Sequence, residues 1–241
     1  MILKKKSRNK KDVDQKDPSQ KVAIFIDGSN FYHSLEENCK RVDVDFLAFA
    51  RKLCDGRSLY RTYYYNVLRD VERNQQAYHD QQKFLSTLYA IPYFDVRLGK
   101  AKLRGDIAVE KGIDIMLATD LLNFAWSKLY DVAILVSGDG DFAYAVQAIK
   151  NIGHYVEVAA FSANLSSDLG RVADEHNLLT PEFFSDLWTQ KNGGLRADKR
   201  IADKRASVKK TSDKRASVKR TDDKKPGDTS RSWWRSKQAS R

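Results

Sequence analysis

The chain has 241 residues, of which 41% are hydrophobic, and it carries a formal net charge of +11. That charge is divided unevenly, with +4 over residues 1–20, −5 over 21–190 and +12 over 191–241, which excludes a globular domain that is itself basic. Two cysteines and four scattered histidines exclude a zinc-binding signature, and no apolar stretch approaches the ~20 residues that a membrane helix requires.

Strand patterns and helix patterns alternate between residues 21 and 190. Short apolar or β-favouring runs predict strands, and apolar residues at helical spacing predict helices. The expected strands are 21–30, which ends in a turn, 58–68, 91–100, 131–138 and 154–161. The expected helices are 44–53, 71–90, 111–126, 141–151 and 165–175, with Pro181 at the start of a further helix. This alternation predicts an α/β fold with a mostly parallel central sheet.

The two ends of the chain have a different character. DKR or DKK recurs at 198, 203, 213 and 223, and DKRASVK occurs twice within residues 191–241. The ten-residue step matches no helical period and builds no apolar stripe, so we predict a disordered, basic, low-complexity tail. Residues 1–20 are predicted to form a second basic, disordered tail. The expected domain therefore spans residues 21–190.

Two of the predicted strands end in aspartate next to small residues. Asp27 follows VAIFI, and Asp139 and Asp141 follow VAILVSG. Since the carboxyl ends of parallel strands meet at one edge, where ligands bind in such sheets, we expect these carboxylates to lie close together. Crowded carboxylates raise one another's pKa unless a divalent cation lies among them. Mg²⁺ or Mn²⁺ held there would polarise a phosphodiester oxygen, lower the pKa of a water molecule and orient its attack.

Two further carboxylates lie in the predicted helix 111–126. Asp114 and Asp120 are six residues apart, about 120° around a helix, so both cannot point at one site. Asp120 is therefore expected either to contact the residues that form the site without touching the ligand, or to lie on the surface. Structural interpretations exist for the others: Asp27 as a turn residue, Asp139 or Asp141 as a helix cap, and Asp114 as a partner of the helix dipole. The recurrence of aspartate at two strand ends favours a functional role.

Three motifs, taken in order, resemble the NYN domain, the LabA-like branch of the PIN-like nuclease superfamily. They are IFIDGSNFY at 24–32, EKGIDIMLATDLL at 110–122 and LVSGDGDFAYAV at 135–146, with TYYYN at 62–66 similar to the second strand of the family. The resemblance covers roughly residues 21–190. It implies a PIN-like three-layer α/β sandwich and a metal-dependent nuclease that acts mostly on RNA.

The resemblance also assigns roles to residues. It implies that one or two Mg²⁺ or Mn²⁺ ions are bound by four catalytic carboxylates. These are Asp27, Asp114, Asp139 and Asp141. It places Asn30, Ser137 and Lys111 where they would position substrate, and Asp120 as an additional acidic residue. A non-catalytic module that binds RNA or protein on the same fold is the alternative.

Two other enzyme classes are disfavoured. A phosphatase of the haloacid-dehalogenase pattern would need a second aspartate two residues after Asp27, where Ser29 stands. A dinucleotide-binding domain would need G-x-G-x-x-G, which neither IDGSN nor SGDGDF supplies. Free thiols and the lack of a signal peptide predict a cytoplasmic location, and homo-oligomerisation is left open.

The basic tails would offset the repulsion between an acidic site and a polyanion. The C-terminal tail would bind phosphates without sequence specificity, and Trp233 and Trp234 would stack on unpaired bases or dock on a partner protein. A purely solubilising tail is the alternative. Deleting residues 191–241 is expected to weaken RNA binding and to flatten its salt dependence, as measured by fluorescence anisotropy. Unchanged affinity at low salt would contradict this role.

Overall fold

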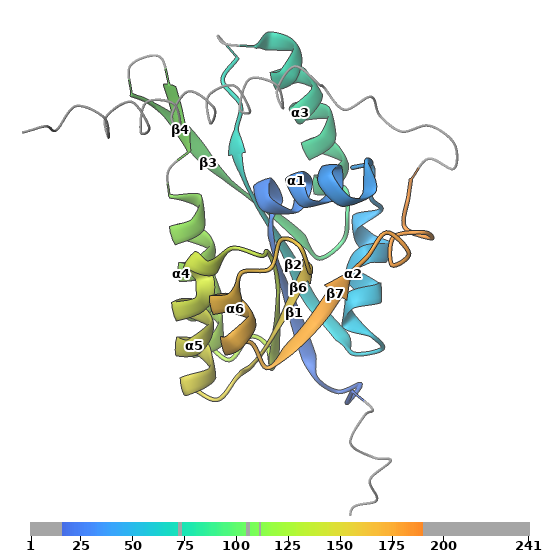
Figure 1. Ribbon diagram of the computed structural model, residues 1–241, viewed down its shortest axis with the longest axis vertical. Coiled ribbons are helices and arrows are strands. Elements are labelled where there is room, and N and C mark those ends of the chain that lie inside the picture. The colour runs from blue at the N-terminus through green and yellow to red at the C-terminus, as the bar shows by residue number, and fades with distance from the viewer. Residues whose placement is uncertain (1–15, 72–73, 105–106, 111, 190–241) are drawn as a thin grey trace, which may run out of the picture. The chain divides into compact units, whose positions relative to one another are not determined.

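A seven-stranded sheet runs through the residues that the computed structural model describes, namely 16–71, 74–104, 107–110 and 112–189 (Figure 1). The strands are β1 (Lys21–Asp27), β2 (Ser58–Leu68), β3 (Phe94–Arg104), β4 (Ile107–Glu110), β5 (Val132–Val136), β6 (Tyr155–Phe161) and β7 (Glu175–Leu179). Their order across the sheet is β4-β3-β2-β1-β5-β6-β7. Every neighbouring pair is parallel except β3 and β4. The predicted α/β fold with a mostly parallel sheet is therefore confirmed.

Helices cover both faces of the sheet (Figure 1). One face packs against α1 (Gly28–Cys39), α2 (Phe46–Cys54) and α3 (Gln75–Tyr89), and the other against α4 (Ile113–Trp126), α5 (Ala143–Asn151) and α6 (Ser167–Val172). Alternate residues of β1 enter the two layers: Ile24 and Ile26 face α1–α3, while Phe25 faces α4–α6. Burial on both faces explains why the strand is a continuous apolar run rather than an alternating one.

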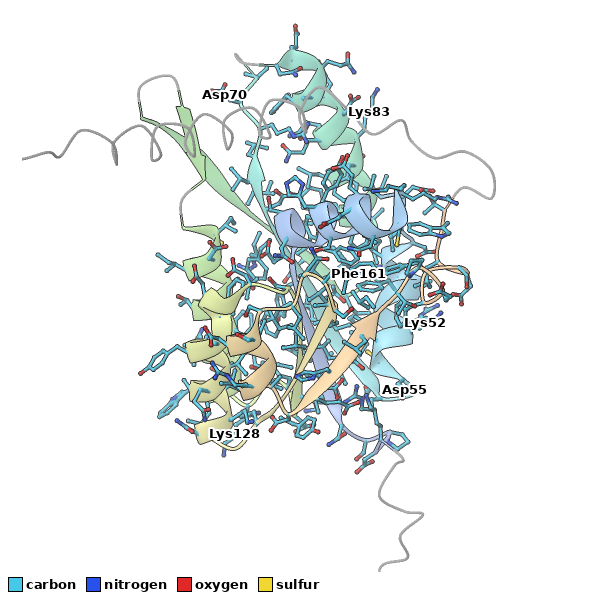
Figure 2. All side chains as sticks on the ribbon, in the orientation of Figure 1. Lys52, Asp55, Asp70, Lys83, Lys128 and Phe161 are labelled. Atoms are coloured by element: carbon cyan, nitrogen blue, oxygen red, sulfur yellow. The ribbon has the colours of Figure 1, made fainter. Side chains whose placement is uncertain are left out.

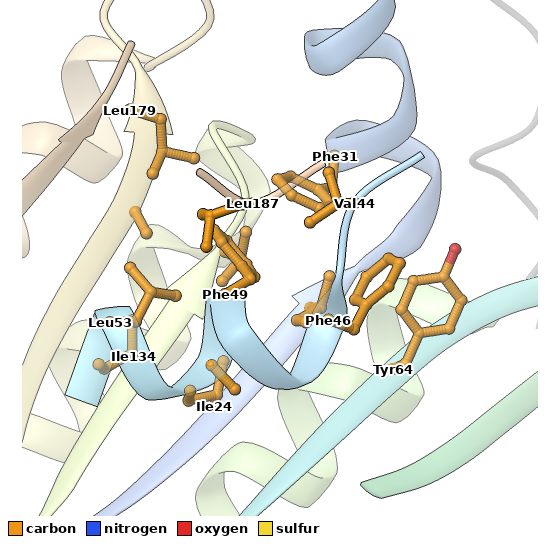
Figure 3. Packing of buried hydrophobic residues seen from close by; sticks show 14 of the residues in the cluster. Ile24, Phe31, Val44, Phe46, Phe49, Leu53, Tyr64, Ile134, Leu179 and Leu187 are labelled. Atoms are coloured by element: carbon orange, nitrogen blue, oxygen red, sulfur yellow. The ribbon is translucent and has the colours of Figure 1, made fainter. Parts of the chain in front are cut away.

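Aromatic side chains fill the layer between the sheet, α1 and α2. The rings of Phe31 and Phe49 stack with centroids 5.0 Å apart, and Phe46 meets Tyr64 edge to face at 5.6 Å. Figure 3 shows these rings together, with Leu187 packed beside Phe49. Each fully buried ring of this kind contributes several kcal/mol of burial and packing energy, so this layer is a major part of the core.

The segment after β7 closes this core without forming the predicted helix. Residues from Pro181 onward make turns, and Phe184 and Leu187 are almost completely buried against α1 and α2. The backbone N–H of Asp45 donates to the carbonyl of Leu187 at 2.7 Å. Lys52 on α2 (Figure 2) also donates to the carbonyl of Phe183 at 2.8 Å. Tertiary packing therefore selects an irregular segment here, although the local pattern begins like a helix.

Three other elements differ from the sequence prediction. A helix, α1, begins directly after Asp27, where we expected a turn. The helix expected over 165–175 is confined to Ser167–Val172, and residues 175–179 form the edge strand β7 instead. The short strand β4 was not predicted. Both missed strands are only 4 or 5 residues long and lie at the sheet edges, where the apolar pattern that marks a strand is weakest.

A buried ion pair joins the turn before β2 to β6. Arg57 donates to both carboxylate oxygens of Glu157, and the side chains are 2% and 0% exposed. Arg57 also donates to the carbonyl of Cys54 at 2.9 Å, and Asn177 donates to Glu157 at 2.8 Å. Burial alone would raise the pKa of Glu157, but the hydrogen bonds from Arg57 and Asn177 outweigh it and hold that pKa below 4.5. A buried carboxylate in this fold thus stays charged because a guanidinium faces it.

The predicted disordered tail 191–241 and residues 1–15 of the predicted tail 1–20 lie outside the described residues. Residues 16–20 are described, and Lys16 donates to Glu157 at 3.3 Å. None of the described helices combines the length and the apolar character needed to cross a bilayer.

Candidate active site

The centre of the sheet contains a topological switch point. From β1 the chain crosses to β2 on one side, and from the adjacent β5 it crosses to β6 on the other side. In open α/β sheets, ligands bind outside the carboxyl ends of the strands at such a point. Asp27 is the last residue of β1, and Ser137 follows the end of β5. In Figure 2, Phe161, the last residue of β6, lies toward this edge, while Lys128, shortly before β5, lies at the opposite edge.

Asp27 is a buried carboxylate, with 4% of its surface exposed. Its Oδ1 accepts the backbone N–H of Asn30 at 3.1 Å, which caps α1, and its Oδ2 accepts the Ser137 hydroxyl at 3.2 Å. Burial, and to a smaller extent the charges of Asp114 and Asp139, raise the pKa of Asp27 from 3.8 to about 6, although these two hydrogen bonds act to lower it. The main causes of that shift include no Lys or Arg charge. The structure thus holds a carboxylate whose negative charge is costly.

The loop after β5 is fixed to the turn after β1. The side-chain oxygen of Asn30 accepts the N–H of Gly138 at 3.1 Å, and the hydroxyl of Ser137 accepts the N–H of Asp139 at 3.1 Å. Asp139 in turn caps the short 3-10 helix η1 (Gly140–Phe142) by accepting the N–H of Asp141 at 3.0 Å. Asn30 and Ser137, which the sequence placed near substrate, therefore hold the carboxylates of Asp27 and Asp139 in place.

The remaining predicted residues occupy different positions. Asp114 is exposed in the first turn of α4 and lies close enough to Asp27 to act on its pKa. Asp141 is exposed in η1. Asp120 is not part of this group: its Oδ2 accepts the Tyr65 hydroxyl at 3.0 Å, which ties α4 to β2. Lys111 lies outside the described residues.

The fit of a divalent metal depends on these donors. Within residues 16–71, 74–104, 107–110 and 112–189, no three Asp, Glu, His or Cys side chains are close enough together to enclose a metal ion. Mg²⁺ does not require such an enclosure, because it usually keeps several waters and binds one or two carboxylates together with substrate phosphate. Asp27, with Asp114 and Asp139 nearby, is a donor set of hard oxygens that suits Mg²⁺ or Mn²⁺ held in this way.

Sequence reasoning missed the loop that supports the site. A Cβ at Gly138 would lie 2.0 Å from the carbonyl oxygen of Asn164, and the N–H of Ser166 donates to the Gly138 carbonyl at 2.9 Å. A Cβ at Gly28 would likewise lie 2.4 Å from the ring of Tyr64. Gly28 in IDGSN and Gly138 in SGDGD are thus needed because other segments of the same chain pack directly against their backbone. The glycines themselves were the only signal, and they did not reveal which segment approaches.

Comparison with known proteins agrees with the fold and the motifs. A family model described as the NYN domain matches residues 21–179. The Low amplitude and bright protein LabA of Synechococcus elongatus is 25% identical over 166 residues, which cover 65% of this chain and 82% of that protein. A solved protein of unknown function from Vibrio parahaemolyticus has the same fold, with a TM-score of 0.58 and 24% identity over 72% of this chain and 99% of its own. The chain therefore belongs to the NYN domain family, as its motifs predicted.

Proposed function

We propose that this protein is a metal-dependent nuclease that hydrolyses phosphodiester bonds in RNA. The observation that supports this most directly is Asp27, a buried carboxylate at the switch point whose pKa is raised to about 6 beside two further carboxylates. Strongly shifted carboxylates of this kind are typical of functional sites, and capping α1 does not require a charge at Asp27, since asparagine caps helices equally well. The family membership and the order of the three motifs support the same reaction class.

The contrast with Glu157 strengthens this interpretation. Both carboxylates are buried in the same sheet, yet the pKa of Glu157 is lowered while that of Asp27 is raised. The difference is the guanidinium of Arg57, which compensates the charge of Glu157 from within the chain. For Asp27 we infer that a cation from solution provides the compensation, and a divalent metal matches the neighbouring carboxylates in charge.

Each residue of the site then has a task in the reaction. Asp27 would hold the metal together with Asp139 and Asp114, and the exposed Asp141 would contribute a further carboxylate. Ser137 keeps the Asp27 carboxylate oriented by donating to Oδ2, and Asn30 keeps the loop of Asp139 in place through Gly138. When bound, Mg²⁺ or Mn²⁺ would neutralise the phosphodiester and orient the attacking water. A cytoplasmic location, where Cys39 and Cys54 stay free thiols, belongs to the same proposal.

Cleavage of labelled RNA tests the proposal. Wild-type protein is incubated with a single-stranded RNA and with a DNA of the same sequence, in Mg²⁺, in Mn²⁺ and in EDTA. Cleavage that requires the metal and that prefers RNA is expected. If neither strand is cut while RNA binding persists in EDTA, the protein is a binding module on the same fold, and the proposed nuclease is wrong.

Gly138→Ala is expected to damage the site while the rest of the domain stays folded. The new Cβ would meet the backbone carbonyl of Asn164, so the loop that carries Asp139 has to shift. A displacement near 1 Å at a catalytic group costs roughly 10²-fold in rate. We expect about that loss in the RNA cleavage assay, with a normal circular dichroism spectrum.

Gly170→Ala is the matched control for this substitution. A Cβ at Gly170 in α6 would meet Leu165 at 3.6 Å, an ordinary contact, so wild-type activity is expected. Wild-type cleavage by Gly138→Ala would show that the position of this loop does not matter for the reaction.

A further inference from the structure

Two large apolar side chains lie exposed next to the acidic site. Ile115 follows Asp114 in the first turn of α4 and is 72% exposed, and Tyr144 lies in the first turn of α5 and is 86% exposed. Both turns lie at the ends of their helices that adjoin the carboxyl edge of the sheet. Single exposed apolar residues are ordinary, so what matters here is that both lie beside the carboxylates of the candidate site.

The two helices that carry these side chains are neighbours on the same face of the sheet. On α4, Asp120 accepts from Tyr65 on β2, and Ile115 lies about 140° around the helix from it, away from that contact. On α5, Lys150 donates to the carbonyl at the end of α6, and Tyr144 lies about 120° around the helix from it, away from that contact. Ile115 and Tyr144 are therefore both exposed in the first turns of two neighbouring helices.

Tyr144 is also coupled in position to the acidic loop. The 3-10 helix η1 runs directly into α5, so Asp141 and Tyr144 are three residues apart in one helical segment. Side chains at this spacing lie one above the other. The phenol ring is thus one turn away from the carboxylate of Asp141, and Ile115 is adjacent to that of Asp114.

We propose that Tyr144 stacks on an unpaired base of the substrate, with the exposed apolar side chain of Ile115 on the neighbouring helix. This inference rests on the proposed nuclease function and adds to it a residue that binds the substrate. Every base presents a π-face to an aromatic ring, which gives affinity without reading sequence. In a duplex those faces are covered by neighbouring base pairs, so the surface selects unpaired nucleotides. Stacking also suits a site whose own charge repels phosphate, because it needs no ionic contact.

Steady-state cleavage of a single-stranded RNA, and of the same strand annealed to its complement, tests this selection. Tyr144→Ala is expected to raise KM for the single strand about 5- to 160-fold, the range for loss of one stacked base. Its kcat is expected to stay near the wild-type value, because stacking stabilises bound substrate and transition state alike. Tyr144→Phe keeps the ring and is expected to behave as wild type.

A substrate lacking one base identifies the contact. We would replace each nucleotide of the RNA in turn by an abasic nucleotide. Wild type is expected to show a raised KM at one position near the cleaved bond, and Tyr144→Ala is expected to show no further increase there. Such non-additivity is the signature of two groups in direct contact. Trp126→Ala is the control, since Trp126 is 76% exposed at the other end of α4.

The outcomes separate this inference from the nuclease proposal. If wild type cuts RNA and Tyr144→Ala keeps the wild-type KM, the stacking inference is wrong and the nuclease stands. If Tyr144→Ala raises KM equally for the single strand and for the duplex, or changes the self-association seen by sedimentation, Tyr144 and Ile115 form a protein contact and the stacking inference is overturned.

If wild type cuts nothing, the nuclease proposal fails. Anisotropy with the same RNAs in Mg²⁺ then decides: weaker single-strand binding by Tyr144→Ala supports stacking, and equal binding overturns it.

Discussion

Asp27→Asn is expected to abolish RNA cleavage and at the same time to stabilise the metal-free protein. Cleavage should fall by at least about 10²–10³-fold, the loss that follows removal of one preorganised electrostatic group. Asparagine keeps an oxygen that can cap α1, and the Ser137 hydroxyl can accept from its amide, so the local structure should survive. What disappears is a buried negative charge.

The gain in stability depends on pH in a direction that follows from the pKa. The pKa of Asp27 is about 6 in the folded protein against an ordinary value of 3.8. Between these values the folded state binds the proton more tightly than the unfolded state, so this group lowers stability as pH rises from 4 to 6. At about 1.4 kcal/mol for each pKa unit, the full difference is roughly 3 kcal/mol. Asp27→Asn should therefore be about 1–3 kcal/mol more stable at pH 7 and no more stable than wild type below pH 4.

Urea denaturation in EDTA at pH 4, 5, 6 and 7 measures this difference. Asp141→Asn removes an exposed carboxylate from the same loop and should change stability by less than about 0.5 kcal/mol. Mg²⁺ or Mn²⁺ should stabilise wild type but not Asp27→Asn, because only the folded wild type offers the site. A variant that is less stable than wild type at pH 7 would show that the charge of Asp27 is already compensated within the protein.

Arg57→Met is expected to cost about 3–5 kcal/mol of stability at pH 7, because it leaves the Glu157 carboxylate buried without its guanidinium. The bonds from Asn177 and Lys16 remain, but they cannot replace a bidentate partner. Replacing both members, as in Arg57→Met with Glu157→Leu, should recover most of the loss, since an apolar pair needs no compensation. Urea denaturation of the single and double variants measures the coupling.

The stability that this pair contributes depends on pH in the opposite direction to that of Asp27. The folded pKa of Glu157 lies below 4.5, so its contribution to stability is complete above 4.5 and disappears as pH falls through the folded value. In Arg57→Met the burial of Glu157 is no longer offset by the guanidinium and raises its pKa, so the penalty should shrink as pH falls from 7 toward 4.5 and the variant's Glu157 takes up a proton. A penalty that is small at pH 7, or that the double variant does not relieve, would contradict the role of the pair.

Local sequence patterns determined the central elements of this protein. VAIFI and VAILV are apolar runs too short for helices, and their β-branched residues favour strands, so β1 and β5 were predictable from their own residues. The aspartates that follow them were recognisable for the same reason, since a polar residue after a buried run marks the strand end. Asp114 was already a candidate carboxylate, and the NYN motifs assigned it a common role with Asp27, which no local pattern would have done.

Long-range packing decided the rest. Glu157 is polar within an apolar strand, and only the fold shows that Arg57, 100 residues earlier in the chain, compensates it. Asp27 has no such partner among the described residues, and burial, a property of the assembled sheet, is what raises its pKa. The same applies to the segment after Pro181, which lines a core instead of forming a helix. Sequence specified which groups are present and where strands end, while charge compensation and burial depend on neighbours distant in the chain, which only tertiary structure brings together.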